Sequence, residues 1–180
     1  TIEGFPNYGI MPIGARDDIY DMENMRQISV YKGATPADLG TASGSKGGAI
    51  ELLYKRPSDK FGVNLQQSIG SNNFSRTFAR IDIGKLKTNT KIFTSFSHTF
   101  ADKWKGSGKL GPRNNFSIGI TQPIIQNLEL EIYANYNNIH RHDFKPLTYD
   151  QAQDIQNTAT EDFNSDLTGD PSKDLYYYDY

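Results

Sequence analysis

Cysteine is absent from the 180 residues of this chain, which excludes disulfide bonds and thiolate chemistry. The net charge is only −2, so nucleic acid is not expected as a partner, because proteins that bind it carry a basic stripe. No apolar run approaches the roughly 18 residues that a membrane helix needs. A helical span is therefore excluded, but a membrane β-barrel is not, since its strands carry apolar residues only at alternate positions.

Apolar residues are also scarce, at 36%, whereas aromatic residues reach 12%, with 11 Tyr and 10 Phe. A disordered chain lacks such rings. This composition indicates surfaces that are polar on one side and apolar on the other.

Residues 1–57 are rich in glycine and turn residues. Short strands are expected at 28–31 and 49–54, with a helical turn over 21–26. From Phe61 onward the pattern changes to strict alternation of apolar and polar residues, which is typical of strands with two different faces. It predicts an antiparallel meander of five strands joined by turns, over residues 61–70, 76–83, 91–100, 115–121 and 128–137.

Alternation alone leaves two all-β architectures open, a soluble sandwich and a membrane barrel. The predicted strands are longer than the five or six residues common in soluble proteins, and approach the roughly 9–11 of a membrane strand. Aromatic residues also gather near the strand ends, as at the two interfaces of a membrane barrel: Phe61, Phe74, Phe100, Trp104, Phe116 and Tyr136. Both features favour the barrel, whereas His98 on the apolar face fits it less well.

Four segments of the first 57 residues carry a resemblance to a known family. They are 25–33 (MRQISVYKG), 38–40 (DLG), 47–52 (GGAIEL) and 55–57 (KRP). In order and spacing they resemble the closing plug motif of TonB-dependent outer-membrane receptors, and residues 2–6 (IEGFP) resemble a motif upstream of it. Three details depart from the family pattern: Ala34 replaces a proline, residues 38–40 lack a tyrosine, and Glu51 replaces an asparagine.

The resemblance implies an all-β membrane protein, in which part of a plug precedes antiparallel up-and-down strands of a 22-stranded barrel. Residues 1–57 would be the C-terminal part of the plug. Residues 58–139 would be the first five membrane strands, and 140–180 part of an extracellular loop. Such receptors lie in the bacterial outer membrane, among its lipid and lipopolysaccharide. They import a scarce ligand, most often a ferric siderophore, using the TonB–ExbB–ExbD energy-coupling complex.

The resemblance also implies where a ligand would bind. Counting back from the 25–33 motif places outward plug apices near Asn7 and Tyr8 and near Arg16. Arg16 would pair with an anionic iron chelate, and Tyr8 would stack on an aromatic one. Alternatively, Arg16 pairs with a neighbouring aspartate and Tyr8 only packs. Lys32 stands where the family often has an arginine that pairs with barrel glutamates, so it is expected to latch plug to barrel.

Other features give weaker signals. His140 and His142 are more simply strand-end residues than metal ligands. Residues 40–47 lack the spacing and the following helix of a phosphate loop. The acidic end of the chain is expected to be a surface loop with a short helix over 149–156, or a disordered tail.

No catalytic set and no cofactor are expected, the ferric chelate being cargo. The rival functions are a soluble all-β binding module, for example for carbohydrate, and a passive porin. The sequence does not identify the ligand.

Overall fold

The computed structural model describes residues 2–5, 20–33, 47–103, 108–142, 149–150 and 177–179. They belong to two compact units. The first unit comprises Thr1–Gly62, Asp82–Phe93 and Ile118–Ala134, and the second comprises Val63–Ile81, Thr94–Ser117 and Asn135–Tyr180.

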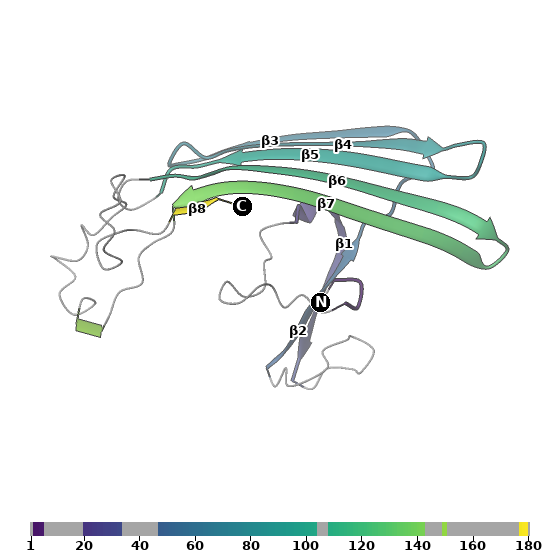
Figure 1. Cartoon of the computed structure of the whole chain (residues 1–180), viewed down its shortest axis with the longest axis horizontal. Coiled ribbons are helices and arrows are strands. Elements are labelled where there is room, and N and C mark those ends of the chain that lie inside the picture. Colours follow the sequence, from purple (N-terminus) through teal and green to yellow (C-terminus); the bar gives the residue numbers. More distant parts are fainter. Residues whose placement is uncertain are drawn as a thin grey trace. The chain divides into compact units, whose positions relative to one another are not determined.

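A two-stranded sheet forms the early part of the first unit. A 3-10 turn, η1 (Met22–Asn24), leads into β1 (Met25–Lys32), which pairs antiparallel with β2 (Gly48–Tyr54) (Figure 1). The two predicted short strands are confirmed and are longer than predicted. The predicted helical turn is the 3-10 turn.

The remaining strands form one sheet in the order β3-β4-β5-β6-β7-β8, so that each strand lies beside its neighbour in sequence (Figure 1). This is the meander that alternation predicts. Its strands are β3 (Gly62–Ile69), β4 (Ser75–Lys85), β5 (Lys91–Phe100), β6 (Leu110–Ile125), β7 (Leu128–His142) and β8 (Tyr177–Asp179).

The predicted ends of β6 and β7 are wrong. β6 already begins at Leu110, although residues 111–113 were expected to lie in a loop, and it continues to Ile125. Gly111 and Pro112 have the composition of a loop, but a long strand accommodates both near its start. The turn that follows is only two residues long, and its Asn127 adopts a φ of 69°, a left-handed conformation that asparagine tolerates.

β7 extends to His142, beyond the predicted end at residue 137, and the short β8 pairs antiparallel with this extension. Periodicity over so short a stretch as β8 does not stand out in a sequence. Residues 149 and 150 are helical, at the start of the helix predicted over 149–156, and the rest of that segment lies outside the described residues.

The two faces of the long strands differ in which kind of side chain is exposed to solvent. Large apolar side chains on one face are exposed: Ile81 by 41%, Phe96 by 47% and Ile132 by 48%. Polar side chains on the other face are buried, as with Ser97 and Ser117, both 0% exposed. A soluble sandwich buries its apolar face. Ile81, Phe96 and Ile132 are instead exposed, on the face opposite these buried polar side chains.

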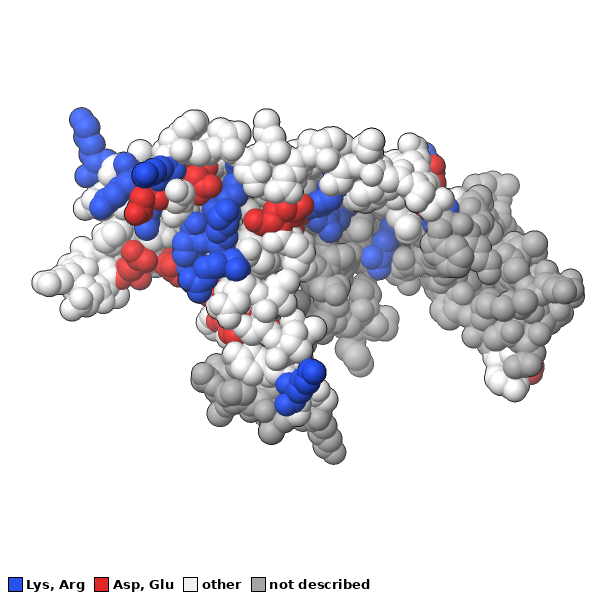
Figure 2. Space-filling view, turned by 180° about the vertical axis from the view of Figure 1, so that it is seen from behind, with Lys and Arg blue, Asp and Glu red and all other residues white. Residues whose placement is uncertain are grey.

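Charged side chains concentrate at one end of the sheet in the first unit. Figure 2 shows acidic and basic groups side by side near the β4–β5 turn, whereas the β6–β7 turn carries no charged residue. Lys91, at the start of β5, is 3.2 Å from Asp59 in one such pair. Among the described residues, no helix is long and apolar enough to cross a membrane.

Candidate functional site

Arg56 lies at the centre of a polar network in the first unit. It follows β2 after one residue, in the segment that connects the two-stranded sheet to β3. Its Nη1 and Nη2 atoms donate to the two carboxylate oxygens of Glu3, at 2.6 and 3.0 Å. This is the two-pronged geometry in which a guanidinium binds a carboxylate most strongly.

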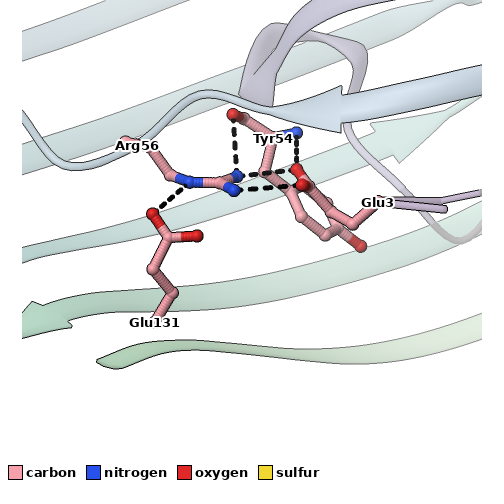
Figure 3. A network of polar contacts seen from close by, with 4 residues as sticks. All are labelled: Glu3, Tyr54, Arg56 and Glu131. Carbon is pink, nitrogen blue, oxygen red and sulfur yellow. Dashed lines mark hydrogen bonds and ion pairs between the residues drawn. The ribbon is translucent and has the colours of Figure 1, made fainter. Parts of the chain in front are cut away.

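Two further groups complete the network (Figure 3). Arg56 Nε donates to Glu131 Oε1 of β7 at 2.5 Å, and Arg56 Nη1 also approaches the carbonyl oxygen of Tyr54 at 3.3 Å. Glu3 in turn accepts the backbone N–H of Tyr54 at 2.6 Å. One guanidinium therefore joins three segments that are far apart in sequence: the start of the chain, the end of β2 and strand β7.

The electrostatics follow from this geometry. The hydrogen bond from Arg56 lowers the pKa of Glu3 from its ordinary value of 4.5, although partial burial opposes the shift. The same hydrogen bond raises the pKa of Arg56. Both groups are therefore charged at neutral pH, and the network is an ion-pair cluster with one cation between two carboxylates.

Aromatic rings pack beside this cluster. Tyr54 stacks on Tyr133 of β7 with ring centroids 3.5 Å apart and planes 13° apart, and Tyr20 meets Tyr54 edge-on at 6.2 Å. Burial raises the pKa of Tyr54, so its phenol is neutral. Phe93 of β5 lies 5.9 Å from the Tyr133 ring and is 1% exposed. The contact of the end of β2 and Arg56 with β7 is thus both ionic and apolar.

Gly119 of β6 allows this packing. A Cβ atom added there would lie 2.2 Å from Cε1 of Phe93, well inside van der Waals contact. The bare backbone of Gly119 therefore gives Phe93 its place on the buried face.

A cavity of about 570 Å³ opens beside the network. Its lining combines the aromatic rings with the charged groups and Thr121. Thr121 is 1% exposed, and its hydroxyl oxygen makes no hydrogen bond within the described part of the chain. The cavity has the mixed apolar and polar lining of a small-molecule site.

The arrangement can hold segments together and can bind a ligand. The groups that meet here are ion pairs and stacked rings, without a nucleophile and base in contact. Over the ranges of the chain that the structure describes, no three His, Asp or Glu side chains are grouped to hold a metal ion.

The predicted site residues have different outcomes. Asn7, Tyr8 and Arg16 lie outside the described residues, so their role in ligand binding stays a prediction. Lys32 is exposed at the end of β1, and its role as a latch also stays a prediction. Sequence reasoning did not assign a role to Arg56, although the 55–57 segment was part of the family motif. Its position two residues after the end of β2 was the available signal.

Comparisons with known proteins give one structural likeness. No family model matches the sequence, and no curated protein matches it. The structure is similar to the pyoverdine outer membrane receptor FpvA from Pseudomonas aeruginosa PAO1 bound to pyoverdine, with a TM-score of 0.61 and 20% sequence identity. The likeness covers 68% of this chain and 18% of that chain. At this identity it establishes the fold alone, and the predicted all-β fold is confirmed.

Proposed function

We propose that this chain belongs to a TonB-dependent importer of the bacterial outer membrane, with a ferric siderophore or similar iron chelate as its cargo. The observation that carries the proposal is the pair of faces on strands β4 to β6, where apolar side chains such as Ile81, Phe96 and Phe116 are exposed and the polar side chains of the opposite face are buried. Hydrocarbon is the solvent that such an exposed face requires.

Two further findings support it. Residues 25–57 resemble the closing plug motif of TonB-dependent receptors in order and spacing. The solved structure with a similar fold is that of an outer-membrane receptor bound to its siderophore. In this function the segment up to Arg56 acts as a plug, and β3 to β7 act as wall strands.

The Arg56 network has a specific role in this function. It ties the end of the plug segment to the wall through Glu131. Energy coupling through the TonB–ExbB–ExbD complex would have to loosen this contact to move the plug. A passive porin has no use for such a connection, and a soluble binding module would turn its apolar residues inward.

The experiment compares an arginine on the exposed apolar face with one in a turn. Phe96→Arg puts a charge at a wall position that is 47% exposed, and is expected to cost about 2–4 kcal/mol if that position lies at mid-membrane. Leu86→Arg, in the turn after β4, changes a side chain of similar exposure at 42% and should be tolerated.

The readouts are the amount of protein in urea-washed outer membranes and its heat-modifiable migration in gels. Uptake of radioactive ferric chelates is then compared in cells with and without TonB. Equal recovery of the two variants, or release of the protein by the urea wash, would refute the membrane assignment. Uptake that persists without TonB would support a porin.

A further inference from the structure

Three lysines lie close together at one end of the sheet in the first unit. Lys60 lies two residues before β3, Lys85 is the last residue of β4, and Lys87 lies in the turn that follows β4. All three side chains are exposed, and Figure 2 shows basic groups near this turn. We refer to Lys60, Lys85 and Lys87 as the lysine cluster.

The backbone holds the members of this cluster beside one another. The N–H of Lys85 donates to the carbonyl oxygen of Asp59 at 2.9 Å. A Cβ atom added to Gly84 would lie 3.2 Å from the carbonyl carbon of Lys60 and 2.9 Å from the backbone nitrogen of Phe61. The segment that leads into β3 therefore lies directly against the end of β4, so that Lys60 and Lys85 are neighbours.

Lys85 continues the exposed, apolar face of β4. Arg80 and Asp82 are buried, whereas Ile81 and Ile83 are exposed by 41% and 44%. Alternation puts Lys85 on the face of the two isoleucines, and it is exposed as they are. A lysine in such a position lays its methylene stem along apolar surface and extends its ammonium group beyond that surface.

Two further apolar side chains lie among the lysines. Phe61 follows Lys60 and is exposed by 71%, and Leu86 stands between Lys85 and Lys87 and is exposed by 42%. This end of the sheet therefore combines exposed apolar side chains with cations at their border.

The charges around the cluster leave it positive. Residues 58–62 and 82–91 contain four basic and two acidic side chains: Lys60, Lys85, Lys87 and Lys91 against Asp59 and Asp82. Asp59 lies 3.2 Å from Lys91, and the buried Asp82 accepts the N–H of Ser58 at 2.8 Å. The remaining carboxylates on the sheet in this unit belong to β7, three strands from β4. Within the ranges that the structure describes, no ion pair involves a lysine of the cluster.

An anionic phospholipid matches both features of this surface. Its acyl chains would cover exposed apolar side chains, and its phosphate would attract ammonium groups at the border of the hydrocarbon. A free phosphate ion would leave the apolar side chains uncovered. A zwitterionic phospholipid carries a cation of its own, which the lysines repel.

We propose that the lysine cluster binds the head group of an anionic phospholipid, whose acyl chains lie along Ile81 and Ile83. This inference rests on the proposed function, because it requires the exposed face of β4 to meet hydrocarbon. It adds a preferred lipid, bound at one surface of the membrane, to the partners of the importer.

The test counts the lipids that stay bound to the full-length protein. The protein is incubated in detergent with equal amounts of dioleoyl phosphatidylglycerol, which is anionic, and dioleoyl phosphatidylcholine, which is zwitterionic. Native mass spectrometry then gives the ratio of the two bound lipids. We expect the wild type to retain mainly phosphatidylglycerol, and this preference should weaken as salt is raised during the incubation.

The variants remove the charges of the cluster. Each lysine near an anionic lipid surface strengthens the attraction about fivefold. Combining Lys85→Gln with Lys87→Gln should therefore lower the ratio about tenfold or more, whereas combining Lys85→Arg with Lys87→Arg should preserve it. The matched control is Lys32→Gln, which removes an exposed lysine at the end of β1, outside the six-stranded sheet, and should leave the ratio unchanged.

Several outcomes would overturn the inference: no preference between the two lipids in the wild type, a preference that salt does not weaken, or an unchanged ratio in the double glutamine variant. An equal loss in Lys32→Gln would also overturn it. If lipid A, offered as a third probe, is retained and phosphatidylglycerol is not, the cluster binds lipopolysaccharide instead. Heat-modifiable migration reports whether each variant folds, and the arginine variant together with the single glutamine variants keeps the test open if the double glutamine variant does not.

Membrane recovery separates this inference from the proposed function. If the protein stays in urea-washed outer membranes and imports a ferric chelate, but shows no lipid preference, the importer stands and the lipid site falls. If the urea wash releases the protein, the proposed function itself falls.

Discussion

Replacement of Arg56 by glutamine is the most informative perturbation of the first unit. The change removes the two hydrogen bonds to Glu3 and the one to Glu131, and it leaves two carboxylates near each other without their shared cation. A hydrogen bond to a charged group contributes about 1.5–3 kcal/mol when it is shielded from water. The side chains of Arg56, Glu3 and Glu131 remain exposed by 37%, 26% and 39%, respectively. Solvent screening therefore reduces the contribution of each hydrogen bond considerably. We therefore expect Arg56→Gln to lower the free energy of local opening of β2 by about 2 kcal/mol in total.

Amide hydrogen exchange measured by mass spectrometry tests this loss in the full-length protein. If β2 exchanges by local opening, 2 kcal/mol corresponds to about 30-fold faster exchange in its peptides, including the Tyr54 amide that Glu3 accepts. Arg56→Lys keeps the positive charge but loses the paired N–H groups of the guanidinium. Its β2 exchange rate should therefore lie between those of the wild type and Arg56→Gln.

The matched control is Lys91→Gln, which breaks a single 3.2 Å contact to an aspartate that is 74% exposed. It should change β2 exchange by less than a factor of about two. Unchanged β2 protection in Arg56→Gln, or equal effects of the two glutamine variants, would show that Arg56 does not hold the segment in place.

Two further predictions concern the same unit. Because Arg56 lowers the pKa of Glu3, the stability from this pair is fully present above the ordinary glutamate pKa and is lost as pH falls through the lowered folded value. β2 protection should therefore decline below about pH 4.5 in the wild type and depend less on pH in Arg56→Gln. An identical pH profile in both would contradict the linkage. Gly119→Ala should destabilise the protein by about 1–3 kcal/mol in thermal unfolding, because its methyl group would overlap the buried Phe93 ring. Gly62→Ala is the control, since no atom lies within 4 Å of the added Cβ there, and similar losses for both would exclude the overlap as the cause.

The sequence predicts this fold best where side-chain alternation is unbroken. β5 was predicted at its observed bounds, Lys91 to Phe100, because apolar and polar residues alternate along its whole length. The start of β6 was missed because Gly111 and Pro112 signal a loop when only neighbouring residues are considered. In the structure this segment pairs with β5, and that pairing outweighs the local preference for a loop. Pairing between strands cannot be predicted from the residues of one segment alone.

The candidate site was less predictable for a related reason. Arg56 meets Glu3 and Glu131, which are 53 and 75 residues away in sequence. No local spacing encodes such a contact. Lys32 was assigned the latch because it stands where the family that the sequence resembles often has an arginine, whereas Arg56, the second residue after β2, had no periodicity to distinguish it. Glu131 lies within the strand predicted over 128–137, but alternation along that strand says nothing about the partner of its carboxylate.

The strict two-residue repeat of β4 to β7 also constrains how this protein can vary in length. Inserting or deleting a single residue within a strand would exchange its two faces from that point onward. The arginines of the second unit would then point into the surroundings of Phe96, and the isoleucines would enter the polar interior. Relatives should therefore differ in length at the turns and in the segments between strands. Within the strands they should differ by residue replacement alone, or by β-bulges that restore the alternation of the two faces.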